Sequence, residues 1–186
     1  MRILALSGSL RRASHNRALI RAAAMELPPG VTLEEWDGLA SLPAFDEDLE
    51  QAGDPEPVAA FKRAVAEADA VLISTPEYNA SMPGALKNAL DWASRPYATN
   101  VFRGKPAAVV GASTGLFGAV WAQAEARKVL KYLGAEILED ELPVGMGETA
   151  FGEDGCLGDP DQQQRLARMI RELTSSEEQS DVELAA

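Results

Sequence analysis

The chain has 186 residues, of which 46% are hydrophobic and 25% are charged, which is the composition of one globular domain. Its net charge of −12 argues against nucleic acid and anionic membrane as partners, because both bind basic surfaces. The single cysteine, Cys156, excludes an internal disulfide and a cysteine-held cluster. No apolar run approaches the ~18 residues of a membrane span. The opening MRILAL reads as a strand rather than a signal peptide, so we expect a cytoplasmic protein.

Strand and helix patterns alternate from the first residues onward. RILALS (2–7) predicts a strand, which a Ser- and Gly-rich loop connects to an amphipathic helix over 16–27. VTLEEW (31–36) predicts the second strand. A loop rich in Gly, Pro and Asp over 37–57 then leads to a helix over 57–68.

The middle of the chain repeats this alternation. AVLIST (70–75) is a continuous β-branched run, as expected of a strand that is buried on both faces. The next helix, over 83–94, opens with Pro and Gly, which favour a helix start. KPAAVVGAS (105–113) predicts the fourth strand, and a glycine-bracketed loop precedes a long helix over 119–133.

The last elements are a fifth strand, AEILED (135–140), and a helix over 159–174 that Asp159 would cap. No linker suggests a second domain, so we expect one domain over residues 1–175. The remaining residues, 176–186, carry acids and no base, and we expect them to be disordered.

Five strands that alternate with five helices predict a three-layer α/β fold, a parallel sheet in the order 2-1-3-4-5 with helices on both faces. In such a sheet, ligands bind beyond the carboxyl ends of the strands, at the switch point between strands one and three. This rule selects the first loop (7–16), the second loop (76–84) and the third loop (112–118) as the candidate site.

The first loop, SGSLRRASHN, combines small residues, hydroxyls and arginines before a helix N-terminus. Backbone N–H groups at such a start, with Ser7, Ser9, Ser14, Asn16 and the fork of Arg11, are suited to a phosphate. The loop lacks both G-x-x-x-x-G-K-[ST] and G-x-G-x-x-G, which favours a terminal monophosphate over a nucleoside triphosphate or a dinucleotide. A capping loop or a solvated basic helix face without a ligand remains the alternative. We interpret the only histidine, His15, as a neutral loop contact rather than a general base.

The other two loops also carry unusual chemistry. In the second loop, Tyr78 brings a ring and Glu77 and Asn79 bring polar groups, which suits a flat heteroaromatic with polar edges. A surface turn is the alternative interpretation. In GASTGLFGA (111–119), three glycines allow the backbone to approach a ligand closely.

Three motifs, GSLRRASHN, PEYNASMPGALKNALDW and GASTGLFGA, in this order, resemble the NADPH-dependent FMN reductases, which include quinone, chromate and azo-dye reductases. The resemblance covers about residues 2–150. It implies a flavodoxin-like fold, non-covalent FMN, NADPH or NADH as co-substrate, and a homodimer or homotetramer. Gly111 and Ala112 depart from members with hydroxyl side chains there, and the segment after Met146 matches no motif.

Carried onto this chain, the resemblance implies three groups of cofactor-binding residues. The FMN phosphate would be held by the side chains of Ser9, Arg11, Ser14 and Asn16 and by the backbone around Leu10 and His15. The ribityl chain and the isoalloxazine ring would be lined by Pro76, Glu77, Tyr78 and Asn79. Ser113 and Gly115 would lie against the flavin from the third loop.

The expected function is therefore an FMN-dependent NAD(P)H oxidoreductase. It would pass hydride from nicotinamide to flavin N5 and electrons on to a quinone, a flavin or a similar small-molecule acceptor. Because flavin performs the chemistry, we nominate no catalytic side chain and no metal. Backbone N–H groups of residues 76–79 would stabilise negative charge on the ring. An FMN electron carrier without NAD(P)H turnover is the alternative, and a flavin-free relative is a third possibility.

Four apolar residues carry further expectations. Leu90 is expected in the core. Trp92 belongs either to the core or to a subunit interface. Phe117 and Trp121 either contact another subunit or are buried within the monomer.

Overall fold

The computed structural model describes the backbone of residues 1–184 and the side chains of residues 1–175. In this part of the chain, the sheet runs in the order β2-β1-β3-β4-β5, with β6 also paired to β4, and all pairs are parallel. The expected order is confirmed. The strands are β1 (Arg2–Ser7), β2 (Thr32–Trp36), β3 (Ala70–Thr75), β4 (Pro106–Ala112), β5 (Glu136–Ile137) and β6 (Leu142–Val144).

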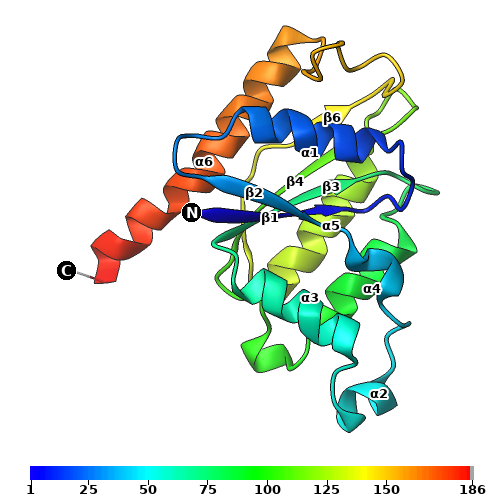
Figure 1. Ribbon diagram of the computed structural model, residues 1–186, viewed down its shortest axis with the longest axis vertical. Coiled ribbons are helices and arrows are strands. Elements are labelled where there is room, and N and C mark those ends of the chain that lie inside the picture. The colour runs from blue at the N-terminus through cyan, green and yellow to red at the C-terminus, as the bar shows by residue number, and fades with distance from the viewer. Residues whose placement is uncertain (185–186) are drawn as a thin grey trace.

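Helices cover both faces of this sheet, as Figure 1 shows. The α-helices are α1 (His15–Met25), α2 (Glu47–Ala52), α3 (Glu56–Ala66), α4 (Gly84–Ala93), α5 (Val120–Leu133) and α6 (Pro160–Leu184), and two 3₁₀ turns lie at Gly38–Ser41 and Tyr97–Thr99. The apolar residues of α1 and α6 pack in one cluster, and those of α3, α4 and α5 pack in a second cluster across the sheet. The three-layer α/β architecture predicted from the sequence is confirmed.

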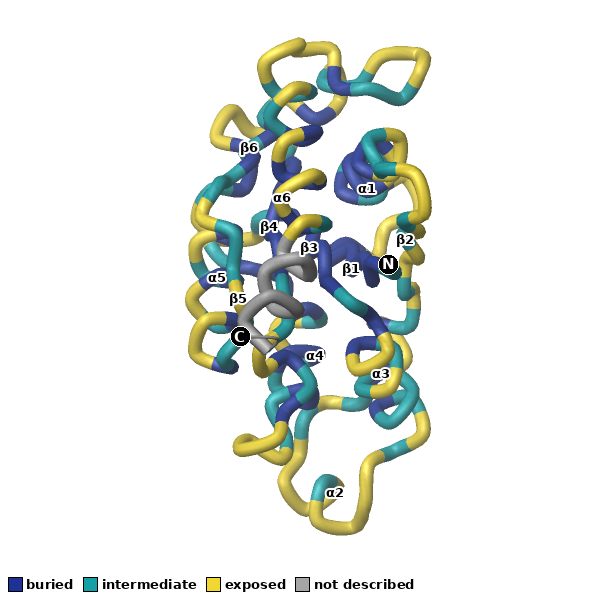
Figure 2. Tube along the Cα trace, turned by 90° about the vertical axis from the view of Figure 1, so that its left-hand side faces the viewer, coloured by how far each residue is buried: buried dark blue, intermediate teal, exposed yellow. Residues whose placement is uncertain are grey.

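The central strands are the most buried part of the molecule. All six residues of β3 are buried, because helices cover both faces of the sheet at this position. Neighbouring residues of β3 face opposite layers, so Val71 belongs to one apolar cluster and Leu72 to the other. The burial colours in Figure 2 show this buried centre between exposed helix surfaces. The edge strand β2 is largely exposed.

The prediction of one strand over residues 135–140 is wrong in its length. Two short strands take its place: Pro106 and Ala107 of β4 pair with β5, whereas Val110–Ala112 pair with β6. Between them, the Arg127 guanidinium donates hydrogen bonds of 2.9 Å to the carbonyl oxygens of Glu139 and Asp140. These two carbonyls therefore bond a side chain, in the segment that separates the two short strands.

Two helices differ from the expectation. The loop predicted over 37–57 contains α2, which Asp46 caps by accepting from the Asp48 N–H at 2.8 Å. Helix α6 continues to Leu184, beyond the predicted end at 174. The side chains of 176–184 and the whole of 185–186 lie outside the described residues, so the boundary at 175 and the disordered tail stay predictions.

The four apolar residues have distinct places. Leu90 is fully buried, as expected. Trp92 is also fully buried, and its Nε1 donates to the Pro43 carbonyl at 2.8 Å, so it belongs to the core. Phe117 and Trp121 are 63% and 49% exposed, which overturns the alternative that the monomer buries them. None of the described helices is long and apolar enough to cross a membrane.

Candidate functional site

The carboxyl ends of the central strands lie side by side. The register pairs Ser7 with Ser74 and Thr75 with Gly111, so the three predicted loops leave the sheet at one edge, on the right of Figure 1. A pocket lies between these loops, as the switch-point rule predicts. It is lined by Ser9, Arg11, Ser14, His15, Asn16, Pro76, Glu77, Tyr78, Ala112, Ser113 and Thr114.

The N-terminus of α1 forms one wall of this pocket. Ser14 caps the helix, because its Oγ accepts a hydrogen bond of 3.2 Å from the Asn16 N–H. Within the described residues, no acceptor faces the backbone N–H groups of Ser14 and His15. Free N–H groups at the positive end of a helix are an anion-binding site.

A free cation lies beside these N–H groups. Arg11 lines the pocket and is exposed, and no carboxylate of the described residues pairs with it. In contrast, Arg17 pairs with Glu35 at 2.8 Å and Arg2 pairs with Glu34 at 3.2 Å. An unpaired guanidinium next to free N–H groups is a suitable donor set for a phosphate. The residues present therefore fit the phosphate of FMN.

Asn16 is placed at the pocket but acts mainly within the protein. Its side chain is buried, and its Oδ1 accepts from the Ala112 N–H at 3.0 Å and from the Ser74 hydroxyl at 2.9 Å. Its Nδ2 donates to the Ala112 carbonyl at 2.9 Å. Asn16 therefore joins the start of α1 to β3 and β4, and one amide hydrogen remains for a ligand.

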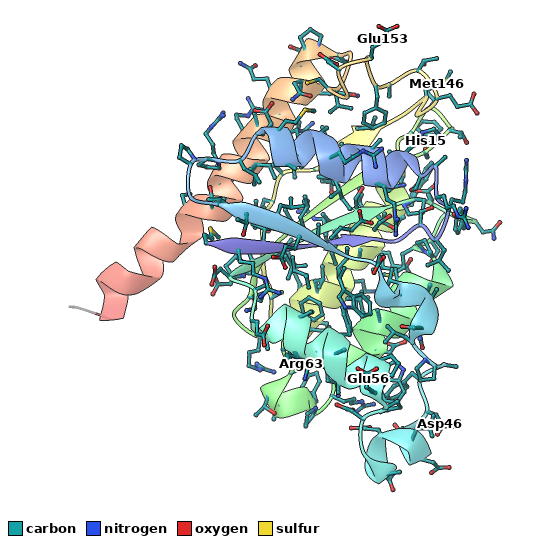
Figure 3. The ribbon with its side chains drawn as sticks, in the orientation of Figure 1. His15, Asp46, Glu56, Arg63, Met146 and Glu153 are labelled. Carbon is teal, nitrogen blue, oxygen red and sulfur yellow. The ribbon has the colours of Figure 1, made fainter. Side chains whose placement is uncertain are left out.

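His15 packs against the segment after Met146, which matches no motif of the family. The glycine at position 147 allows the imidazole to pack close, since a Cβ there would lie 2.9 Å from the ring. The Gly147 N–H donates to the Ser113 carbonyl at 2.9 Å, so residues after Met146 support both His15 and the third loop. Figure 3 shows His15 and Met146 at the same end of the molecule.

The second loop is a tight hairpin. Tyr78 and Ser81 exchange backbone hydrogen bonds of 3.0 and 3.2 Å around Asn79 and Ala80, whose φ angles are 55° and 59°. The Tyr78 N–H is used by this turn, and Pro76 has none. Of the residues on this loop that line the pocket, only Glu77 has an N–H without an acceptor in the described part of the chain. Asn79 is exposed at the hairpin tip, outside the pocket lining.

The Glu77 carboxylate contacts helix α5 instead of the pocket. Its Oε2 accepts from the N–H groups of Trp121 at 2.9 Å and Ala122 at 3.1 Å. In the reverse direction, Glu125 of α5 accepts from the Ser81 hydroxyl and the Met82 N–H. These two hydrogen bonds lower the pKa of Glu125 below its ordinary value, with nearby Lys87 and Lys128 contributing in the same direction.

The remaining predicted residues lie around the pocket with different roles. Ser113 lines it, and its hydroxyl donates to the Gly115 carbonyl at 3.2 Å, whereas Gly115 itself is outside the lining. Leu10 lines a neighbouring hollow together with Arg11 and Tyr78. The prediction missed two lining residues, Ala112 and Thr114, although both stand in the glycine-bracketed motif that was singled out.

The titratable side chains that line this pocket are those of Arg11, His15, Glu77 and Tyr78. Across the described residues, no group of three or more His, Cys, Asp and Glu side chains is arranged to hold a metal ion. The site offers hydrogen bonds, one free cation and an exposed ring. Such a site binds and orients a cofactor that brings its own reactivity.

A doubly wound sheet with an anion site at its first loop and an aromatic ring on its second defines a flavodoxin-like mononucleotide-binding protein. Residues 1–149 match the model of the NADPH-dependent FMN reductase family, and the chain belongs to this family. The resemblance carried by the three motifs is confirmed, and so is the expectation of a flavoprotein oxidoreductase that uses FMN and NAD(P)H.

Similar proteins include an NAD(P)H-dependent FMN reductase of Pseudomonas aeruginosa, 40% identical over 93% of this chain and 93% of that protein. A 2-hydroxy-1,4-benzoquinone reductase of a Burkholderia species is 40% identical over 89% of this chain and 90% of its own. Among solved structures, FerB, a flavoenzyme NAD(P)H:(acceptor) oxidoreductase of Paracoccus denitrificans, is similar with a TM-score of 0.80. FerB is 35% identical over 92% of this chain and 94% of its own.

Proposed function

We propose that this enzyme binds the phosphate of FMN between the first loop and the start of α1 and uses the cofactor to reduce a quinone, free flavin or similar small acceptor. One observation carries the binding mode: Arg11 is free of ion pairs in the described residues and lines the pocket beside the free N–H groups of Ser14 and His15. Ser9, whose Oγ accepts only a long 3.4 Å hydrogen bond from Arg11 N, adds a hydroxyl donor.

FMN bound in this pocket would supply the redox chemistry between the nicotinamide and the acceptor. The protein's task is then to hold the ring and to stabilise charge. The Glu77 N–H is free to donate to the flavin ring as negative charge develops there. The Tyr78 side chain, which is 50% exposed, supplies an aromatic wall. No side chain of the pocket is needed as an acid or a base.

The choice of acceptor rests on the relatives. A benzoquinone reductase at 40% identity over most of both chains favours a quinone as the class of substrate. The test is NAD(P)H oxidation by the FMN-loaded protein with a benzoquinone, followed at 340 nm, with NADPH and NADH compared. An electron carrier would reduce the quinone only after a separate reductase is added, and that result would replace this proposal with the flavodoxin alternative.

We also propose that the protein is a homo-oligomer whose subunits meet over the rim of the pocket. Six large apolar side chains are exposed in the three loops, at the start of α5 or just after β6. They are Leu10, Tyr78, Leu116, Phe117, Trp121 and Met146. Phe117 and Trp121 contact each other edge to face at 5.3 Å. Clustered exposed apolar side chains of this kind are typical of an interaction surface.

Light scattering after size exclusion tests this interface. We expect the molar mass of a dimer or tetramer for wild type. The double variant Phe117→Ser, Trp121→Ser is expected to have a lower molar mass, because its subunits dissociate. Tyr132→Ser is the matched control, because Tyr132 is 72% exposed at the other end of α5. A double variant with the wild-type mass would refute the assigned face, and a monomeric wild type would refute the oligomer.

A cytoplasmic location completes the proposal. The single cysteine, Cys156, leaves the chain without an internal disulfide, as is usual for proteins of reducing compartments. Cell fractionation with an antibody to the protein tests it.

A further inference from the structure

Helix α5 holds both ends of the hairpin in the second loop. Before the turn, the Glu77 carboxylate accepts from Trp121 N at 2.9 Å and Ala122 N at 3.1 Å. After the turn, Ser81 Oγ and Met82 N donate to Oε2 of Glu125 at 2.5 and 2.9 Å. The two carboxylates reach in opposite directions, one from the loop to the helix and one from the helix to the loop. We call these four hydrogen bonds the carboxylate clamp.

The first half of the carboxylate clamp replaces a missing helix cap. The residue before α5, Ala119, has a φ of 61° and no side-chain oxygen to accept from the first turn. Glu77 supplies that acceptor from another element, and its negative charge is favourable at the positive end of the helix. The loop is thereby fixed to a helix of 14 residues.

The second half is built around Glu125, which is half-buried on the first half of α5. Lys87 and Lys128 lie close enough to favour its charged form. Glu125 is not among the residues that line the pocket or the neighbouring hollow in the described part of the chain. An effect of Glu125 on the cofactor must therefore pass through the loop.

The hairpin needs such a restraint. Asn79 and Ala80 both have left-handed backbone conformations, which are unfavourable for residues with a Cβ, and Tyr78, Asn79 and Ala80 are exposed. The helix that restrains it is itself fixed, because the buried Gln123 side chain donates to the Gly118 carbonyl at 2.9 Å and accepts from Leu142 N at 3.3 Å. A rigid platform thus holds a strained turn.

We infer that Glu125 is a positioning residue for the flavin, acting through Ser81 and Met82 to hold the second loop in its cofactor-binding shape. This inference rests on the proposed function. In that shape, Glu77 and Tyr78 line the pocket. When Glu125 is removed, the hairpin loses the anchor on its far side, and part of the FMN binding energy is spent on ordering it.

The experiment measures FMN affinity by fluorescence quenching and the unfolding of the apo-protein by circular dichroism. Glu125→Ala is expected to weaken FMN binding about tenfold and to change the visible spectrum of the bound flavin. Glu125→Gln keeps a side-chain oxygen that can accept from Met82 N, and its affinity is expected within about threefold of wild type. The FMN affinity of Ser81→Ala is expected to lie between those of Glu125→Ala and Glu125→Gln. Glu136→Ala, an exposed acid on β5, is the matched control and is expected to change nothing.

The outcomes separate this inference from the proposed function. If wild type binds no FMN, the proposed function itself fails. If wild type binds FMN and Glu125→Ala binds it with unchanged affinity and spectrum, Glu125 has only a structural role and the inference fails, even where the apo-protein unfolds at a lower temperature. Should Glu125→Ala not fold, Ser81→Ala takes its place, because Glu125→Gln is expected to stay close to wild type. An FMN affinity and a flavin spectrum equal to those of wild type in Ser81→Ala then overturn the inference.

Discussion

Replacement of Asn16 by alanine is the sharpest perturbation that the structure offers. The change removes one acceptor and one donor from a buried site and leaves three groups without partners: the Ser74 hydroxyl, the Ala112 N–H and the Ala112 carbonyl. Ser74 is 0% exposed and Ala112 is 1% exposed, so bulk water does not reach them directly. Each unsatisfied buried group costs about 1–3 kcal/mol, and with some relaxation we expect a loss of about 4 kcal/mol in the free energy of unfolding. That is a large part of the ~5–15 kcal/mol that stabilises a typical domain.

Urea denaturation of the apo-protein, followed by circular dichroism, measures this loss, and an FMN titration at low urea measures the effect on the site. Because Asn16 fixes the start of α1, FMN affinity is expected to fall together with stability. Asn88→Ala is the matched control: Asn88 also bonds two backbone groups, Phe45 N and the Pro43 carbonyl, both at 2.8 Å, but away from the pocket. It should lower stability and leave FMN affinity unchanged. If Asn16→Ala lowers the free energy of unfolding by less than about 1 kcal/mol, the three groups find other partners, and the reasoning is refuted.

Three further outcomes are expected. Arg11→Ala should weaken FMN binding at least about tenfold in a fluorescence titration, because a charge-assisted contact is lost, while apo-protein stability stays the same; equal affinity would contradict the phosphate site. Leu90→Ala should lower the free energy of unfolding by about 2–5 kcal/mol through a core cavity, with FMN affinity unchanged in the folded protein. The hydrogen bond from Arg165 holds the pKa of Asp140 below its ordinary value of 3.8. The stability from this pair is therefore present above that value and lost as pH falls through the lowered pKa, so Asp140→Asn should flatten the acid side of the stability curve below about pH 4, and an unchanged slope would count against it.

Much of the site could be predicted because its chemistry is concentrated in short, contiguous stretches. The first loop shows its serines and Arg11 next to a helix start, and the switch-point rule brings that loop to the second and third ones without any measured distance. Ala112 and Thr114 lie within a motif that was recognised, so the error there concerned which residues of a loop face inward.

What the sequence determined by itself is the alternation of apolar strands and amphipathic helices, the order of the parallel sheet and the loops at its carboxyl edge. These follow from local periodicity and from the handedness of crossovers, which act over a few tens of residues. Only the tertiary structure decided which side chains are free to meet a ligand. The side chains of Asn16 and Glu77 are both polar groups that could bind a ligand. In the structure, Asn16 is hydrogen-bonded to Ala112 and Ser74, and Glu77 is hydrogen-bonded to the start of α5. Their partners lie 44 to 96 residues away in the chain, and a contact over such a distance exists only once the layers have packed.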